Sequence, residues 1–335
     1  MSKILAERGL ILPRRGSRHR LGLIAIVVLV ILGACLPIFV KNQPFLLMLA
    51  SYSVIAAILA LSLDMLTGNT GLLSFGHAAW YGFGAYFAGL LSKSVTDDIL
   101  LLMLATATAA ALVSAVVGSI LVRQIGKTFA ILTLALSQIM FATVFVFSEL
   151  TGGEDGLQGI PIASFLGFQI VDSRVWYWVL YGTLVSALAA AIHIRRSPLG
   201  KAWLAIRDNT ERSRYIGNNV ALLKLLSYVM SATLASIAGA LFVLFNGAAS
   251  PDLLNWFESG KILMYVVLGG VGSLVGPVVG AVVFTFAEHY VSSFTDAWLI
   301  YFGGLFVIIV IVAPGGLFGA ATKLWTSAIG SEAER

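Results

Sequence analysis

The side chains of this 335-residue chain that could do covalent chemistry or bind a metal are few and are not spaced for either. Ser74 lacks the preceding glycine of a G-x-S-x-G nucleophile elbow. A G-x-x-x-x-G-K-[ST] nucleotide site is also missing, because Lys127-Thr128 follows Gly126 without a second glycine five residues earlier. The four histidines do not form the zinc motif H-E-x-x-H: His19, His77, His193 and His289. We therefore expect no enzyme, no ATPase site, no metal and no cofactor on this chain.

Two ionisable side chains stand out because they fall inside long apolar runs, where a charge is costly and is a functional candidate by default. For His77, two roles stay open. The imidazole either takes part in gating or substrate contact, or it only satisfies backbone carbonyls that neighbouring glycines leave free. Asp64 lies near the inner end of its run, where it could reach interfacial water instead.

Glycine interrupts two apolar regions that lie about 200 residues apart. Since glycine costs about 1 kcal/mol relative to alanine inside a helix, this density needs a reason. Close helix packing in lipid is one reason, and broken helices that line a transport path are the other. The residues concerned are Gly71, Ser74, Gly76 and His77 in the first region, and Gly269, Gly272 and Gly276 in the second.

The composition of the whole chain predicts an all-α polytopic membrane protein with about 8–10 transmembrane helices. Its residues are 59% hydrophobic, and its mean hydropathy is +0.95. A membrane-spanning helix needs about 20 mostly apolar residues. Ten runs qualify, of which the eighth and ninth are short and rich in glycine: 21–40, 46–66, 72–92, 99–122, 128–148, 175–194, 224–246, 262–273, 276–290 and 297–313.

Basic residues predict the orientation of these runs. In the ten-span arrangement, 17 of the 21 lysines and arginines fall on one side, which includes a basic N-terminus at residues 1–20 and a C-terminus at 315–335. We therefore expect both termini in the cytoplasm and one permease domain over residues 1–335. The net charge of +5 follows from this topology and implies lipid rather than nucleic acid as the partner.

Cys35 is the sole cysteine, so an intrachain disulfide is excluded. It follows Leu32-Gly33-Ala34 behind a basic segment and an apolar run, as in a lipoprotein cleavage site. The residues after it are still apolar, whereas a lipoprotein usually begins a polar tether there. We therefore expect an uncleaved chain.

Residues 197–219 form a polar insert between two apolar runs. Ser197-Pro198 is typical of a helix start, and an apolar face follows at helical spacing. Asn209 and its neighbours offer caps for a second short helix, with Gly217 as its stop. Two interpretations stay open. The helices either insert into a groove of a cytoplasmic partner, or they lie on lipid headgroups.

An ordered set of short motifs resembles the LivM-type permeases of the branched-chain amino acid ABC importers. The set spans about residues 45–320, and its order is more specific than any one piece. Its members are G-x-x-G-x-x-S-x-G-H-A at 68–78, A-I-R-D-N at 205–209, E-R at 211–212, I-G at 216–217, L-G-G-V-G-S-L-V-G-P at 268–277 and A-P-G-G-L at 313–317.

The resemblance implies a bacterial inner-membrane importer that works by alternating access. Its other parts would be a sister permease in a heterodimer, two cytoplasmic ATPase subunits that bind ATP and Mg²⁺, and a periplasmic substrate-binding protein. The insert would couple this chain to the ATPase, although Glu211 and Gly217 keep only the outer positions of the general E-A-A-x-x-x-G loop. The coupling residues would be Gly200, Arg207, Asp208, Asn209, Glu211, Arg212 and Gly217.

Other functions stay open at this point. Related importers carry urea, short amides or aromatic acids instead of branched-chain amino acids. A secondary transporter driven by an ion gradient would need acidic or other ion ligands at the membrane midplane, and the apolar runs are nearly free of them.

Overall fold

The computed structural model describes residues 33–37, 43–124, 126–295, 297–312 and 315–319. The described chain is almost entirely helical, with a single small hairpin of β1 (Ser164–Phe165) and β2 (Phe168–Gln169). The helices, in chain order, are α3 (Pro44–Thr70), α4 (His77–Ser94), α5 (Ile99–Leu121), α6 (Lys127–Val146), α7 (Ser148–Thr151), η1 (Gly153–Asp155), α8 (Ser173–Arg196), α9 (Pro198–Asp208), α10 (Thr210–Tyr215), α11 (Val220–Asn246), η2 (Pro251–Leu254), α12 (Trp256–Gly269), α13 (Val275–Ser292) and α14 (Trp298–Val312).

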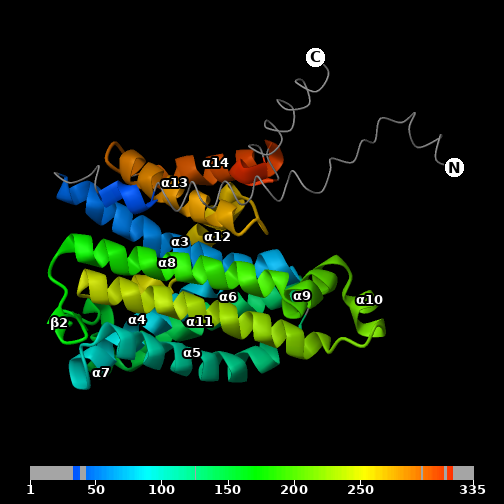
Figure 1. Ribbon diagram of the computed structural model, residues 1–335, viewed down its shortest axis with the longest axis horizontal. Helices are drawn as coiled ribbons and strands as arrows, with labels where there is room; N and C mark the ends of the chain where they lie inside the picture. The colour runs from blue at the N-terminus through cyan, green and yellow to red at the C-terminus, as the bar shows by residue number, and fades with distance from the viewer. Residues whose placement is uncertain (1–32, 38–42, 125, 296, 313–314, 320–335) are drawn as a thin grey trace, which may run out of the picture.

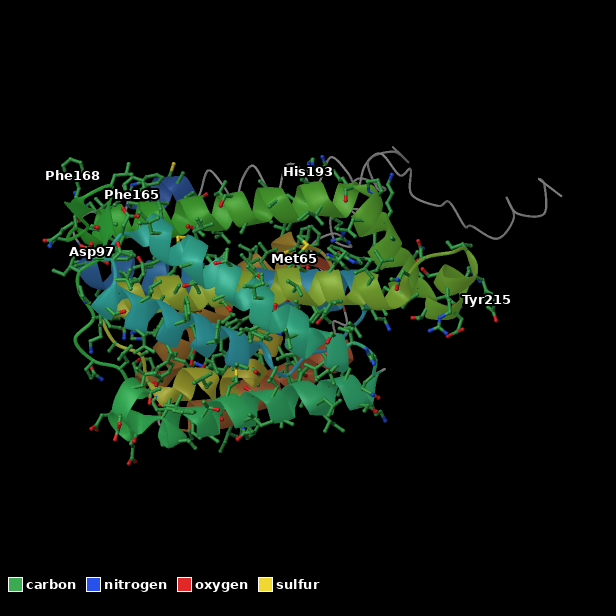
Figure 2. The ribbon with its side chains drawn as sticks, turned by 90° about the horizontal axis from the view of Figure 1, so that it is seen from below. Met65, Asp97, Phe165, Phe168, His193 and Tyr215 are labelled. Carbon is green, nitrogen blue, oxygen red and sulfur yellow. The ribbon has the colours of Figure 1, made fainter. Side chains whose placement is uncertain are left out.

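The long helices lie side by side along the longest axis of the molecule (Figure 1). The short helices α9 and α10 stand at one end of this bundle, and α7 and the β hairpin stand at the other. Figure 2 shows the same polarity, with Tyr215 at one extremity and Asp97, Phe165 and Phe168 at the opposite one.

Helices α3 and α11 form the centre of the bundle, whereas α5 and α6 lie at its periphery. In the most apolar window of each helix, 78% of the residues are buried for α3 and 61% for α11, against 28% for both α5 and α6. The exposed positions of α5 include Leu104, Leu112, Val116 and Ile120. Large apolar side chains on an outer face suit contact with lipid tails, so the burial pattern agrees with a polytopic membrane protein.

Helices occur at nine of the ten apolar runs; the first run, 21–40, lies mostly outside the described residues, as do the basic N-terminus and most of 315–335. In the described part of the chain, six helices are long and apolar enough to cross a membrane: α3, α5, α6, α8, α11 and α13. The 14-residue α12 rises only about 21 Å. Because a hydrocarbon core is about 30 Å thick, α12 cannot cross it alone.

Glycine brings α4 and α11 into backbone contact near the bundle centre. A Cβ atom on Gly84 of α4 would lie 1.9 Å from the carbonyl oxygen of Ser236, and one on Gly239 of α11 would lie 1.8 Å from that of Tyr81. Trp80 and Tyr228 fix the same pair of helices by a 2.9 Å hydrogen bond between the indole Nε1 and the phenol oxygen. The contact therefore requires glycine at both positions.

Replacing either glycine should destabilise the bundle. We expect Gly84→Ala and Gly239→Ala each to lower the free energy of unfolding by about 1–3 kcal/mol, because the added methyl group would meet backbone that cannot move aside. Denaturation of the purified protein in detergent measures this. Gly182→Ala on α8 is the control, since its Cβ would meet nothing within 4 Å. Equal stability of all three variants would contradict the expectation.

Candidate functional site

The insert forms two helices, α9 and α10, in the order that the sequence predicts. Ser197 caps α9 by accepting the Gly200 N–H at 3.4 Å, and Pro198 occupies the first turn. Gly200 packs against the end of α8, where a Cβ would lie 2.4 Å from the carbonyl oxygen of Ile194. The direction of α9 relative to α8 is therefore fixed by a backbone contact that a side chain would prevent.

Helix α9 is also fixed to α11. The side chains of Trp203 and Ile206 are 0% and 1% exposed, and the indole Nε1 of Trp203 donates to the carbonyl oxygen of Leu223 at 2.7 Å. These two residues belong to the apolar face that the helical spacing predicts. Because α9 is held on both sides, a force applied to it reaches α8 and α11 directly.

Helix α10 projects from the end of the bundle (Figures 1 and 2). Asn209 caps it by accepting the Arg212 N–H at 2.9 Å, and Gly217 follows its end at φ +90°. Ser213 is buried, whereas Glu211, Arg212, Arg214 and Tyr215 are exposed, and Glu211 and Arg214 form an ion pair at 3.6 Å. Most of the predicted coupling residues lie on this exposed surface: Asp208, Asn209, Glu211, Arg212 and Gly217.

Arg207 differs from these residues because it turns back toward the bundle. Its Nη1 donates to the carbonyl oxygen of Gly68, in the last turn of α3. Gly71 then ends α3 at φ +75°, and a Cβ there would lie 3.4 Å from Cγ of Arg207. The guanidinium therefore caps the C-terminal end of α3, where the helix dipole favours a positive charge.

Asp64 lies one turn before Gly68 on α3 and joins that helix to the segment between α12 and α13. Its two carboxylate oxygens accept the N–H of Gly272 at 2.5 Å and of Leu274 at 3.1 Å. The side chain is 0% exposed. The expectation that Asp64 reaches interfacial water is therefore wrong: backbone N–H groups take the place that water would fill.

The segment 270–274 has the backbone of a tight break. Gly270, Gly272 and Leu274 have φ angles of +111°, +82° and +62°, and the last is unusual for a leucine. A Cβ on Gly272 would lie 2.7 Å from Nη1 of Arg207 and one on Gly68 would lie 2.8 Å from Cα of Gly272. Arg207, the end of α3 and the α12–α13 break thus meet at one place. We call Asp64, Gly68, Arg207, Gly272 and Leu274 the Arg207 junction.

His77, the first residue of α4, is 1% exposed and has a partner at each ring nitrogen. Nδ1 lies 3.1 Å from Oγ of Ser74, and Nε2 lies 2.7 Å from Oγ of Ser231. Because Ser231 donates its own proton to the carbonyl oxygen of Ser62, it accepts from Nε2–H, and Ser74 then donates to Nδ1. The network favours a structural role for the imidazole, and a role in gating stays a prediction.

The remaining glycines of the two interrupted regions lie at close backbone contacts. A Cβ on Gly76 would lie 2.5 Å from the carbonyl oxygen of Thr133 on α6. Gly269 and Gly276 face each other across α12 and α13, and a Cβ on Gly269 would lie 1.9 Å from the carbonyl oxygen of Gly276. Close packing of the backbones therefore explains why glycine occupies these positions. That the same glycines line a transport path stays a prediction.

An ionic cluster on α12 and α13 was missed by the sequence interpretation. Lys261 Nζ lies 2.8 Å from Oε2 of Glu258 and 3.7 Å from Oε1 of Glu288. The i, i+3 spacing of Glu258 and Lys261 was the available signal for their ion pair. Glu288 falls near the end of the apolar run 276–290, and the sequence does not indicate its partner on α12. In the described part of the chain, no three His, Cys, Asp or Glu side chains are grouped to hold a metal ion.

Loss of the Asp64 carboxylate should loosen the α12–α13 break. In Asp64→Ala the N–H groups of Gly272 and Leu274 lose their acceptors, at a cost of about 1–3 kcal/mol each. We expect hydrogen exchange of these two amides to accelerate by roughly ten- to a hundredfold. Asp155→Ala is the control, because its side chain is exposed. Unchanged exchange in Asp64→Ala would contradict this role.

The profile of one family matches residues 45–314, and that family is described as the permease component of branched-chain amino acid transport systems. The chain is 28% identical to the high-affinity branched-chain amino acid transport system permease protein LivM of Escherichia coli K12, over 87% of this chain and 74% of that protein. It is 30% identical to LivM of Salmonella typhimurium, over 80% of this chain and 69% of that protein.

The permease protein LivH of the same Escherichia coli system is 25% identical, over 78% of this chain and 91% of that protein. No solved structure matches the chain. The profile match covers the Arg207 junction, α9, α10 and both glycine-interrupted regions. The chain therefore belongs to the family of permease components of branched-chain amino acid transport systems.

Proposed function

We propose that this chain is the permease subunit of an ATP-driven importer and that α9 and α10 couple it to a cytoplasmic ATPase subunit. The observation that carries the proposal is that one part of the insert is exposed while the adjoining part is fixed to the bundle. Helix α10 is exposed and projects from the bundle, whereas α9 is held by Gly200, Trp203 and Arg207 to four parts of the membrane region. A segment of this kind receives a force at its tip and passes it into the bundle.

The tip of α10 offers an apolar anchor among charges. Tyr215 is 87% exposed and Ile216 is 70% exposed. Large apolar side chains are seldom exposed together unless they bind something, and aromatic residues are common anchors of protein interfaces. Glu211, Arg212 and Arg214 surround this pair as a polar rim. We infer that Tyr215 and Ile216 enter a groove of the ATPase subunit.

The Arg207 junction converts motion of the insert into motion of the bundle. When ATP binding closes the two ATPase subunits, they displace α10, and α9 moves with it. Arg207 then pulls on the end of α3 and on the α12–α13 break at the same time. Alternating access follows from rocking these helices against the rest, with no covalent step on this chain. ATP and Mg²⁺ belong to the partner subunits.

The substrate that we propose is a branched-chain or other hydrophobic amino acid. The names of the relatives from Escherichia coli and Salmonella typhimurium support this substrate. The occurrence of two permease proteins, LivM and LivH, among the relatives from Escherichia coli supports a heterodimer of this chain with a sister permease. A periplasmic binding protein would deliver the substrate and set most of the selectivity.

We place the protein in the bacterial cytoplasmic membrane with α10 on the cytoplasmic side. Basic residues support this orientation, since Lys201, Arg212 and Arg214 lie at the α10 end. Asp97 marks the opposite end (Figure 2). In the ten-span arrangement, six spans precede the insert and four follow it. Both termini would therefore lie on the same side of the membrane as α10, which is the cytoplasmic side in this proposal.

The docking surface can be tested by truncating its anchor. We expect Tyr215→Ala to weaken association with the ATPase subunit at least tenfold, since a central aromatic anchor is commonly worth about 2 kcal/mol or more. Co-purification and titration of the subunits in detergent measure this. Phe168→Ala is the matched control, because Phe168 is 81% exposed at the other end of the bundle. Equal association of the two variants would argue against the surface.

Arg207 should separate docking from transport. We expect Arg207→Met to keep the ATPase subunit bound while uptake into proteoliposomes falls roughly ten- to a hundredfold, because the insert loses its hold on α3. Lys201→Met, an exposed change on the same helix, should leave uptake unaltered. Normal uptake by Arg207→Met at normal assembly would exclude the junction as the transmission element.

A further inference from the structure

The ionic cluster of Glu258, Lys261 and Glu288 has one more negative than positive side chain, and it lies in a bundle whose described residues include few other buried ionisable groups, such as Asp64 and His77. Each of its side chains keeps about a fifth of its surface exposed, at 19%, 19% and 22%. Ionisable groups at membrane depth are costly and mark substrate or ion pathways by default. The partial exposure means that a solute can reach all three.

The three side chains of the cluster line a partly open cavity of about 150 Å³, to which α3, α4, α11, α12 and α13 contribute residues. Its lining also includes the apolar side chains of Ile55, Leu59 and Phe242. A lining that combines charged groups with aliphatic and aromatic side chains fits a small molecule that has a polar head and an apolar tail.

Hydroxyl groups complete the polar part of the lining. Oγ1 of Thr285, one turn before Glu288 on α13, is buried without a hydrogen-bond partner among the described residues. Tyr81 and Tyr265 also line the cavity. A buried hydroxyl without a partner is rare in folded proteins, and a bound ligand is one way to satisfy it.

The cavity lies in the half of the bundle opposite to the Arg207 junction. Glu288 precedes the end of α13 at Ser292 by four residues. Tyr52, which also lines the cavity, donates a 2.8 Å hydrogen bond to Asn246, the last residue of α11. In the proposed orientation this half is the one next to the periplasm, from which substrate arrives.

We propose that this cavity is a binding site for a hydrophobic L-amino acid on its way through the permease. The ammonium group of the ligand lies against Glu288, which is 3.7 Å from Lys261 and so retains acceptor capacity. The carboxylate of the ligand accepts hydrogen bonds from the Lys261 ammonium and from the Thr285 hydroxyl. The apolar side chain of the ligand packs against Ile55, Leu59 and Phe242. The site rests on the proposed transport function, and it names the residues by which this chain, rather than the binding protein, holds the substrate.

Direct binding to the assembled permease–ATPase complex in lipid nanodiscs, without the binding protein, tests the site. The probe is radiolabelled L-leucine. We expect saturable binding that unlabelled L-leucine displaces. Leucinamide, which lacks the carboxylate, and 4-methylpentanoate, which lacks the ammonium group, should each compete at least tenfold more weakly, because each loses one of the two charged contacts.

Two variants assign the contacts. Glu288→Gln should weaken L-leucine binding at least tenfold and should remove the preference for L-leucine over 4-methylpentanoate. Thr285→Val should weaken binding severalfold without lowering thermal stability, since the hydroxyl has no partner to lose. Glu149→Gln, an exposed acid on α7, is the matched control and should bind as the unaltered chain does.

Absence of L-leucine binding to the unaltered complex would overturn the site, as would tenfold discrimination that survives in Glu288→Gln. Stabilisation by Na⁺ or K⁺ that depends on Glu288, without L-leucine binding, would overturn it in favour of a cation site. Stimulation of ATP hydrolysis by the binding protein is measured on the same samples. If the binding protein stimulates hydrolysis while L-leucine does not bind, the site fails and the proposed transport function stands.

Discussion

A buried carboxylate must have its oxygens hydrogen-bonded, and at Asp64 that requirement holds two distant parts of the chain together. The N–H groups that satisfy it belong to Gly272 and Leu274, more than 200 residues away, in a segment whose backbone is bent into the left-handed region. Neither side is stable alone, since the carboxylate would lack donors and the bent segment would lack acceptors. The position of α12 and α13 relative to α3 depends on this exchange.

Arg207 extends the same arrangement to the insert formed by α9 and α10. Its guanidinium lies against Gly272, where a side chain would be in the way, and it reaches the carbonyl oxygen of Gly68 at the end of α3. The insert is therefore attached to the two elements that Asp64 already joins. A displacement of α9 acts on both of them together, which a flexible loop between α8 and α11 would not do.

Helices α12 and α13 connect this junction to the ionic cavity. The break between them takes part in the junction, while Glu258 and Lys261 on α12 and Glu288 on α13 face the cavity at the other end. Gly269 and Gly276 keep the two helices in backbone contact at the junction end. The Arg207 junction and the ionic cavity are therefore connected by one pair of helices.

The sequence by itself determined the helices and the caps of the insert, because these depend on periodicity and on local contacts such as Asn209 with Arg212. It did not determine that Asp64 is satisfied by a distant backbone, that Arg207 turns inward while Arg212 faces solvent, or that Lys261 lies between two carboxylates from different helices. The first two depend on residues that meet across more than 100 positions of the chain, and the third on a contact between two helices. Only the tertiary structure decides such pairings, since a local pattern gives a residue its face on a helix and not the neighbour that this face meets.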